Sequence, residues 1–228
     1  MTGSLEDIRA EIDALDAEMR VGLLRRAQLV AQIANAKAAN GDAATPLRPM
    51  REMQQMRALL AWQQAEAPML STAGLQAIWR EIIGMALSQQ GGMTVYASPA
   101  AEAAARAHFG ASLAYGNAPA DLSELAGNGR ALVVLGLAEA CAPPGGMTVF
   151  ARLPLDGAAA CLCYGAQIDE DPIAAGGVYL ARRANARDGD NVLFTGDDYV
   201  LVETRAPEND PIWGRFLTLE DMVPETEK

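Results

Sequence analysis

The 228-residue chain is acidic and half hydrophobic: 29 Asp and Glu against 18 Lys and Arg give a formal net charge of −11 at pH 7. An acidic protein binds the phosphate backbone poorly, so we expect no nucleic-acid partner. No apolar run approaches the roughly 18 residues that a membrane-spanning helix needs, so no membrane association is expected. The length allows one or two domains with a buried core.

Cysteine and histidine usage limits the chemistry further. Cys141, Cys161 and Cys163 form no paired set, which is typical of free thiols in a reducing compartment. The N-terminal residues MTGSLEDIR are partly acidic and contain no apolar segment, so we expect a cytoplasmic protein without a secretory signal. His108 is the one histidine, which argues against histidine-based zinc sites and Ser-His-Asp triads.

Charge is unevenly distributed along the chain. Residues 1–90 hold nine Lys and Arg and ten Asp and Glu, so nearly all of the excess acid follows them. The change in composition coincides with Gly91 and Gly92. It predicts two domains, residues 1–91 and residues 92–228.

A long amphipathic helix is predicted over residues 5–37. Its apolar residues recur mostly three or four apart, at Leu5, Ile8, Ile12, Leu15, Met19, Leu23, Val30 and Ile33. Ser4 is a suitable N-cap, and Glu6 and Asp7 lie in the first turn, where the helix dipole favours negative charge. Such a helix would span roughly 50 Å, too long for one small globule to bury. We therefore expect partner helices from a second copy of the chain.

The cations of this helix occupy defined faces. Arg26 and Lys37 are close to three turns apart and so lie on one side. Arg9 lies about a quarter-turn off that face. In an antiparallel pair of helices, Arg9 of one copy would approach the Arg26 and Lys37 face of the other and form a pocket for a small anion with several carboxylates. The alternative interpretation is that all three are solvated surface charges.

Two further helices are expected in the first 90 residues. The first helix should end near Asn40-Gly41, since Gly commonly follows helix C-termini. A second helix is expected over residues 48–67, and a third over residues 74–90, capped by Ser71 or Thr72.

Four segments of these helices are informative when taken together. They are IRAEIDALD (8–16), LLRRAQLVAQIANAK (23–37), PLRPMRE (46–52) and IWREIIGMALSQQ (78–90). In this order and spacing they resemble the all-helical class of chorismate mutases. In that family three helices form an intertwined homodimer whose two active sites each take an arginine from the partner's first helix, a role that fits Arg9.

The resemblance implies conversion of chorismate to prephenate in phenylalanine and tyrosine biosynthesis. The rearrangement is unimolecular, so it needs no nucleophile, metal or organic cofactor. The protein holds the dianion in a compact conformation and stabilises charge on the breaking ether oxygen. By correspondence, Arg26 and Arg9 of the partner subunit would hold the two carboxylates. Lys37 and Gln90 would donate to the ether oxygen, and Glu52 would accept from the ring hydroxyl.

Two positions depart from the family's pattern. Members often carry an Asp four residues before the glutamate and a small hydroxyl residue four before the glutamine, where this chain has Arg48 and Ala86. The loss of one hydrogen bond to substrate would weaken binding by about 1–3 kcal/mol. Arg48 and Arg51 add cations beside Glu52. Arg48 either contacts a substrate carboxylate or pairs with Glu52 one turn away.

The second half of the chain predicts an α/β domain of unknown role. Strands are expected at residues 93–97, 131–136, 147–153, 160–166, 178–183 and 199–204, and helices at 98–110 and 119–127. The acidic cluster at 169–171 is interpreted as a solvated turn. The domain loosely resembles the second domain of mutase–prephenate dehydratases, but it lacks their Thr-Arg-Phe and Glu-Ser-Arg-Pro segments, so dehydratase activity is not expected.

Three alternatives stay open. An isochorismate-pyruvate lyase uses a similar cationic pocket. A non-catalytic descendant, kept for ligand sensing or dimerisation, would also preserve the helices. Within the mutase hypothesis, Gln89 is the alternative to Gln90 as the ether-oxygen donor.

Overall fold

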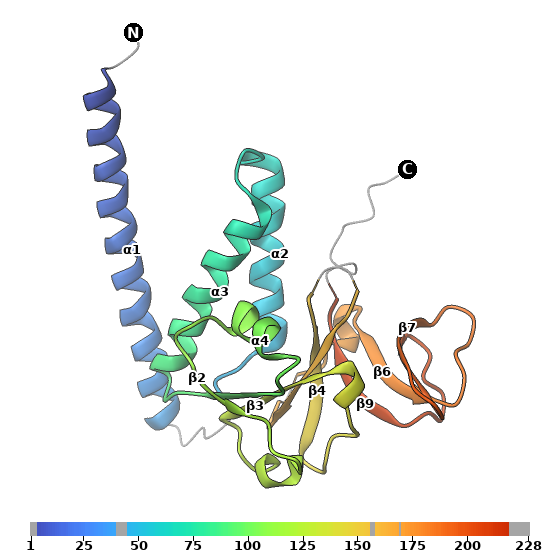
Figure 1. The fold of residues 1–228 in the computed structure, drawn as a ribbon. Helices are drawn as coiled ribbons and strands as arrows, with labels where there is room; N and C mark the ends of the chain where they lie inside the picture. Colours follow the sequence, from blue (N-terminus) through green and yellow to red (C-terminus); the bar gives the residue numbers. More distant parts are fainter. Residues whose placement is uncertain (1–3, 40–44, 156–157, 169, 219–228) are drawn as a thin grey trace. The chain divides into compact units, whose positions relative to one another are not determined.

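A computed structural model of the chain describes residues 4–39, 45–155, 158–168 and 170–218. Three long helices come first (Figure 1): α1 (Leu5–Ala39), α2 (Pro49–Glu66) and α3 (Thr72–Gln89). A mixed β-sheet with one short helix, α4 (Glu102–Phe109), follows them. The predicted fold class, a helical region followed by an α/β region, is confirmed.

Contacts between residues divide the chain into two compact units. The first consists of Met1–Ala43 with Gln89–Gly91, and the second of Ala44–Ser88 with Gly92–Lys228. Helix α1 therefore belongs to one unit, whereas α2, most of α3 and the sheet belong to the other. The domain boundary after residue 91 stays a prediction from the sequence.

Helix α1 begins with the predicted cap. The backbone N–H of Asp7 donates to the Ser4 hydroxyl at 3.2 Å, and the Asp7 carboxylate accepts from the Ser4 N–H and O–H groups at 2.9 and 2.8 Å. These hydrogen bonds lower the pKa of Asp7. The predicted helix end near Asn40-Gly41 lies outside the described residues.

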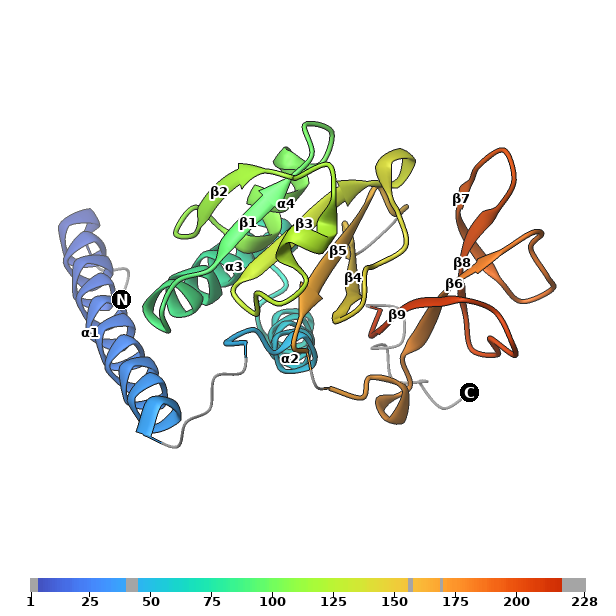
Figure 2. The ribbon, with the colours of Figure 1, turned by 90° about the horizontal axis from the view of Figure 1, so that it is seen from below.

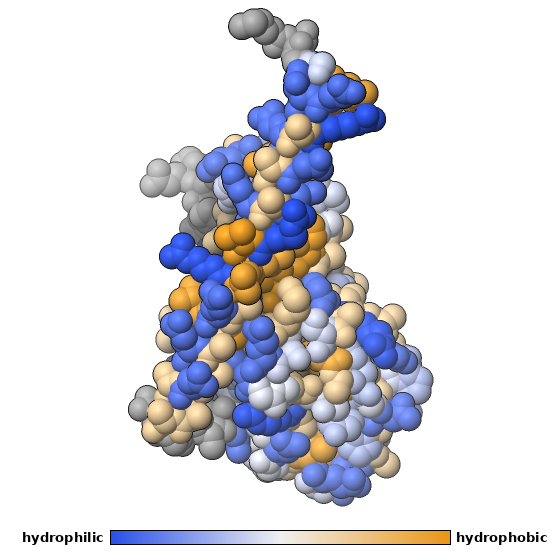
Figure 3. Space-filling view, turned by 90° about the vertical axis from the view of Figure 1, so that its left-hand side faces the viewer, coloured by the Kyte–Doolittle hydropathy of each residue, from blue (hydrophilic) through white to orange (hydrophobic). Residues whose placement is uncertain are grey.

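The N-terminal half of α1 presents its apolar seam to solvent. From Leu5 to Leu23 the seam residues are between 42% and 63% exposed. Hydrophobic residues accordingly lie at the surface of this helix among charged ones (Figure 3). Val30 differs, because only 7% of it is exposed.

The other two long helices form where the sequence places them. Helix α2 starts with Pro49 in its first turn, where the missing N–H costs no helical hydrogen bond. Helix α3 is capped by Ser71, whose hydroxyl accepts from the Gly74 N–H at 3.2 Å. Thr72, the alternative cap, is the first residue of the helix.

Nine strands form the sheet in the described part of the chain. They are β1 (Thr94–Ala97), β2 (Ala114–Asn117), β3 (Ala131–Gly136), β4 (Met147–Leu153), β5 (Cys161–Ala166), β6 (Val178–Arg183), β7 (Asn191–Thr195), β8 (Val200–Thr204) and β9 (Ile212–Phe216). Their order is β2-β1-β3-β5-β4-β9-β6-β8-β7 (Figure 2). Strand β1 pairs in parallel with β2 and β3, and β4 with β9, whereas the other pairs are antiparallel.

All six predicted strands and the first predicted helix of this region are confirmed. The helix expected at 119–127 is wrong: the segment contains one 3₁₀ turn, Leu122–Leu125, started by the Asp121 side chain on the Ser123 N–H. The sequence analysis missed β2, β7 and β9. Each is short, and β2 and β9 contain a glycine, which weakens the strand pattern.

Helices α3 and α4 are packed against one face of the sheet. Ile83 and Leu87 of α3 share a hydrophobic cluster with Phe109 of α4 and Val95 of β1. Strand β3 contributes alternate residues to this cluster and to a second one on the opposite face, as the two-residue period of a strand requires.

The contact between α3 and the end of α4 is close. A Cβ at Gly84 would overlap the Phe109 carbonyl oxygen, so only glycine fits there. One turn earlier, the Glu81 carboxylate accepts hydrogen bonds from the Ala111 N–H at 2.6 Å and from the Ser112 hydroxyl. Both bonds lower the pKa of Glu81. Helix α3 is thereby fixed to the first βαβ segment of the sheet region.

We expect Gly214→Ala to destabilise the protein by at least about 2 kcal/mol. Gly214 pairs with Val149 where β9 meets β4, and an added Cβ would overlap the Val149 carbonyl group. Urea unfolding of both proteins measures the change. Gly127→Ala is the control, because a Cβ at Gly127 meets no atom within 4 Å. An equal effect of the two substitutions would contradict the steric argument.

Candidate active site

Two of the predicted cations share one face of α1. The less exposed residues of the described helix are Arg26, Ala27, Val30, Ala34 and Lys37, which recur three or four apart. Partial burial lowers the pKa of Arg26. The expectation that Arg26 and Lys37 lie on one side of the helix agrees with this pattern. Arg9 lies in the exposed N-terminal half.

Glu52 is a buried carboxyl group in α2. Its side chain is 12% exposed, and one carboxylate oxygen lies 3.5 Å from the Arg80 guanidinium of α3. Burial raises the pKa of Glu52 to about 7; Arg80 opposes the rise and Glu170 adds to it. The group therefore titrates near neutral pH.

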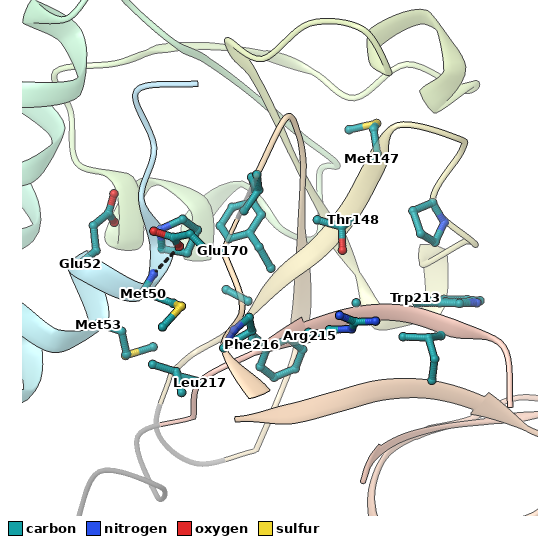
Figure 4. Close-up of a pocket in the computed structure, with 18 of the residues that line it drawn as sticks. Met50, Glu52, Met53, Met147, Thr148, Glu170, Trp213, Arg215, Phe216 and Leu217 are labelled. Carbon is teal, nitrogen blue, oxygen red and sulfur yellow. Dashed lines mark hydrogen bonds between the residues drawn. The ribbon is translucent and has the colours of Figure 1, made fainter. Parts of the chain in front are cut away.

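Residues from two parts of the chain hold the start of α2. Arg48 is the N-cap residue, and its guanidinium donates to the carbonyl oxygens of Thr45 and Leu47 at 2.9 and 3.2 Å. The Glu170 carboxylate, from the segment after β5, accepts from the Met50 N–H at 2.8 Å (Figure 4). In the structure the Arg48 guanidinium bonds to these two carbonyl oxygens, whereas the carboxylate of Glu52 lies beside Arg80.

Glu52, Arg80 and Glu170 line a cavity of about 460 Å³. Its other walls come from the start of α2, from β4 and from β9 (Figure 4), and they are mainly apolar, with Met50, Met53, Phe150, Ile168, Trp213 and Phe216 among the lining residues. Arg215 of β9 and Thr148 of β4 add polar groups. A cavity of this size and lining is suited to a small molecule.

His108 also lines this cavity and a second one of about 260 Å³, and Arg80 is shared between the two. Burial, together with the nearby Arg80 charge, keeps the pKa of His108 well below its ordinary value. The imidazole is therefore neutral at pH 7. It makes an edge-on ring contact with Phe109, which is in line with a packing role at the end of α4.

The remaining predicted site residues are distributed over both units. Gln90 is half-buried and belongs to the unit of α1, together with Arg9, Arg26 and Lys37. In the other unit, Ala86 is buried in α3 and Arg51 is exposed on α2.

Sequence reasoning missed Arg80 and Glu170. Arg80 stands inside a segment that resembles the family, yet a single arginine in an amphipathic helix gives no sign that it is buried. Glu170 lies in the acidic cluster interpreted as a solvated turn, and its carboxylate is instead partly buried against α2. No sequence signal links it to a helix 120 residues away.

Within residues 4–39, 45–155, 158–168 and 170–218, no three His, Cys, Asp or Glu side chains are grouped so that they could hold a metal ion. Of the helices in these ranges, none has the length and apolar character for crossing a membrane.

Comparison with known proteins gives one match. Residues 8–91 match the family described as chorismate mutase type II, a range that includes α2, α3, nearly all of α1 and the eight predicted site residues. The match supports chorismate mutase activity in general, and this family implies an isomerase. No curated protein and no solved structure matches the chain. The loose likeness of the sheet region to prephenate dehydratases is not confirmed.

We expect the stability of the protein to fall between about pH 4.5 and pH 7 because of Glu52. The unfolded chain releases this proton near the ordinary pKa of 4.5 and the folded protein at about 7, so the folded state binds more protons in that interval. At about 1.4 kcal/mol per pKa unit, the loss amounts to at most about 3.5 kcal/mol.

Glu52→Gln should abolish this contribution, so that the variant gains stability relative to the native protein as the pH rises. Urea unfolding at pH 4.5, 6 and 8 measures it, with Glu66→Gln, an exposed position on the same helix, as control. A stability difference between native protein and Glu52→Gln that stays constant over pH would show that Glu52 ionises as in the unfolded chain.

Proposed function

We propose that this protein is a chorismate mutase that converts chorismate to prephenate as a homodimer. The observation that carries the proposal is the match of residues 8–91 to the type II family. The sheet region lies outside that match, and we assign it no reaction of its own.

The residue types suit the reaction. Chorismate carries two carboxylates, which the bidentate guanidinium of Arg26 and the corresponding group of a partner subunit's Arg9 can each hold. Lys37 and Gln90 are donors for the ether oxygen, where negative charge builds as the bond breaks. That Arg26 and Lys37 share the less exposed face of α1 supports a common substrate contact.

Glu52 would accept a hydrogen bond from the ring hydroxyl of the substrate. The ionised carboxylate accepts at both oxygens, whereas the neutral acid offers its proton as a donor as well. With a pKa of about 7, the population of the accepting form changes over the physiological range. We therefore expect turnover to rise with pH near neutrality.

The dimer is supported by the exposed seam of α1. Leu5, Ile8, Ile12, Leu15 and Met19 are each about half exposed or more, and a helix with such a stripe is stabilised by burying it against another helix. A second copy supplies an identical seam. Arg9 stands among these residues, so it would be brought to the interface.

Lys37→Ala should lower kcat for chorismate by at least about 100-fold, since one donor to a developing oxyanion contributes about that much. The measurement is loss of chorismate by purified protein, with products separated. Arg20→Ala, at an exposed position of α1, is the control and should retain activity. Native protein that leaves chorismate unchanged would refute the proposal, and faster turnover of isochorismate would favour the lyase alternative.

A second prediction concerns the shared site. Arg9→Ala and Lys37→Ala should each be inactive alone, yet mixing them after joint unfolding and refolding should restore about a quarter of native activity. Half of the dimers would be mixed, and each of these contains one site with both native residues. If the mixture stays inactive while mixed dimers are detected by mass, Arg9 does not act across the interface.

A further inference from the structure

The first turn of α2 lacks a cap of its own. Pro49 has no N–H, and Arg48, the N-cap residue, makes no side-chain capping bond because guanidinium groups cannot accept. The Met50 N–H is therefore left to find an acceptor elsewhere.

Glu170 supplies that acceptor from the sheet region. Its carboxylate accepts from the Met50 N–H at 2.8 Å, and a negative charge at this end of a helix is favoured by the helix dipole. Glu52 follows two residues after Met50, and its own N–H bonds to the Arg48 carbonyl at 3.0 Å. The same contact thus fixes the backbone that carries Glu52.

We propose that Glu170 is a positioning residue for Glu52, capping α2 in place of residue 48 and holding a negative charge beside the Glu52 carboxyl. The sheet region would then control the helical site through one side chain. The inference rests on the proposed function, since it assigns Glu170 a role in the same reaction.

Several charged groups act on Glu52 and Glu170 together. Arg80 of α3 pairs with Glu52, and its charge also reaches His108 of α4. Burial raises the pKa of Glu170, and the bond from the Met50 N–H and the nearby Arg48 charge oppose that rise. The Glu170 charge raises the pKa of Glu52, so its removal should lower that pKa.

Two substitutions separate the cap from the charge. Glu170→Gln keeps an oxygen acceptor for the Met50 N–H and removes the charge, whereas Glu170→Ala removes both. Arg48→Asp in the Glu170→Ala background restores a cap within α2 itself. Asp171→Asn is the control, because Asp171 is a neighbouring exposed carboxylate whose bond, to the Ile173 N–H, an amide can also accept.

For Glu170→Gln we expect the rise of kcat with pH to move to lower pH while the urea midpoint stays near native. Glu170→Ala should move the rise in the same direction, lower the midpoint and reduce kcat about tenfold, because a misplaced catalytic group reacts slowly. Arg48→Asp should restore the midpoint in that background. If Glu170 caps α2 but does not influence Glu52, the pH dependence of kcat would be the same in these variants as in the native protein.

NMR titration of the Glu52 carboxyl and hydrogen exchange of the Met50 amide provide readouts that need no turnover. If native protein is inactive on chorismate but both signals respond to Glu170 substitution as expected, the proposed reaction fails and the positioning contact stands. If Glu170→Gln and Glu170→Ala leave the Glu52 titration and the Met50 exchange rate unchanged, the inference is overturned.

Discussion

Burial of the Glu52 carboxyl beside Arg80 is the interaction on which the α2–α3 part of the protein depends. An unpaired charge at either position would be expensive in an apolar surrounding, and the pair alone compensates burial only in part. The carboxyl group responds by titrating near neutrality. The helices must therefore keep both side chains in place. Two contacts with the sheet region help to do so: the Glu170 carboxylate of that region accepts from the start of α2, and the Glu81 carboxylate of α3 accepts from the Ala111 N–H.

The helical region is thus divided in an unexpected way. Helices α2 and α3 share a compact unit and a hydrophobic cluster with the sheet, so they have partners within the chain. Helix α1 differs in how its residues are exposed. A stripe of partly buried residues lies near its C-terminal end, and the apolar seam before that stripe is exposed. The exposed apolar seam of α1 is the reason that a second copy of the chain enters the proposal.

The sequence was informative where periodicity is strong. The three long helices, the caps at Ser4 and Ser71 and six strands follow from hydrophobic spacing and capping chemistry that act over a few residues. Strand β9 was missed because Gly214 interrupts its pattern, and that glycine is required by a contact with β4 that no local rule reveals. Glu170 was misread for the same reason, since its partner Met50 is distant in the chain. Local chemistry predicts elements, whereas the pairing of distant side chains decides how the candidate site is held.

The pairing of β4 with β9 also determines how firmly the two parts of the sheet are held together. Five strands lie on one side of it and four on the other, and in the described residues the two strands are in register only at Val149 and Gly214. A ladder of one residue pair resists bending far less than the five-residue ladders of β3–β5 or β6–β8. The cavity beside Glu52 is lined from both strands, so it spans the boundary between these two groups of strands.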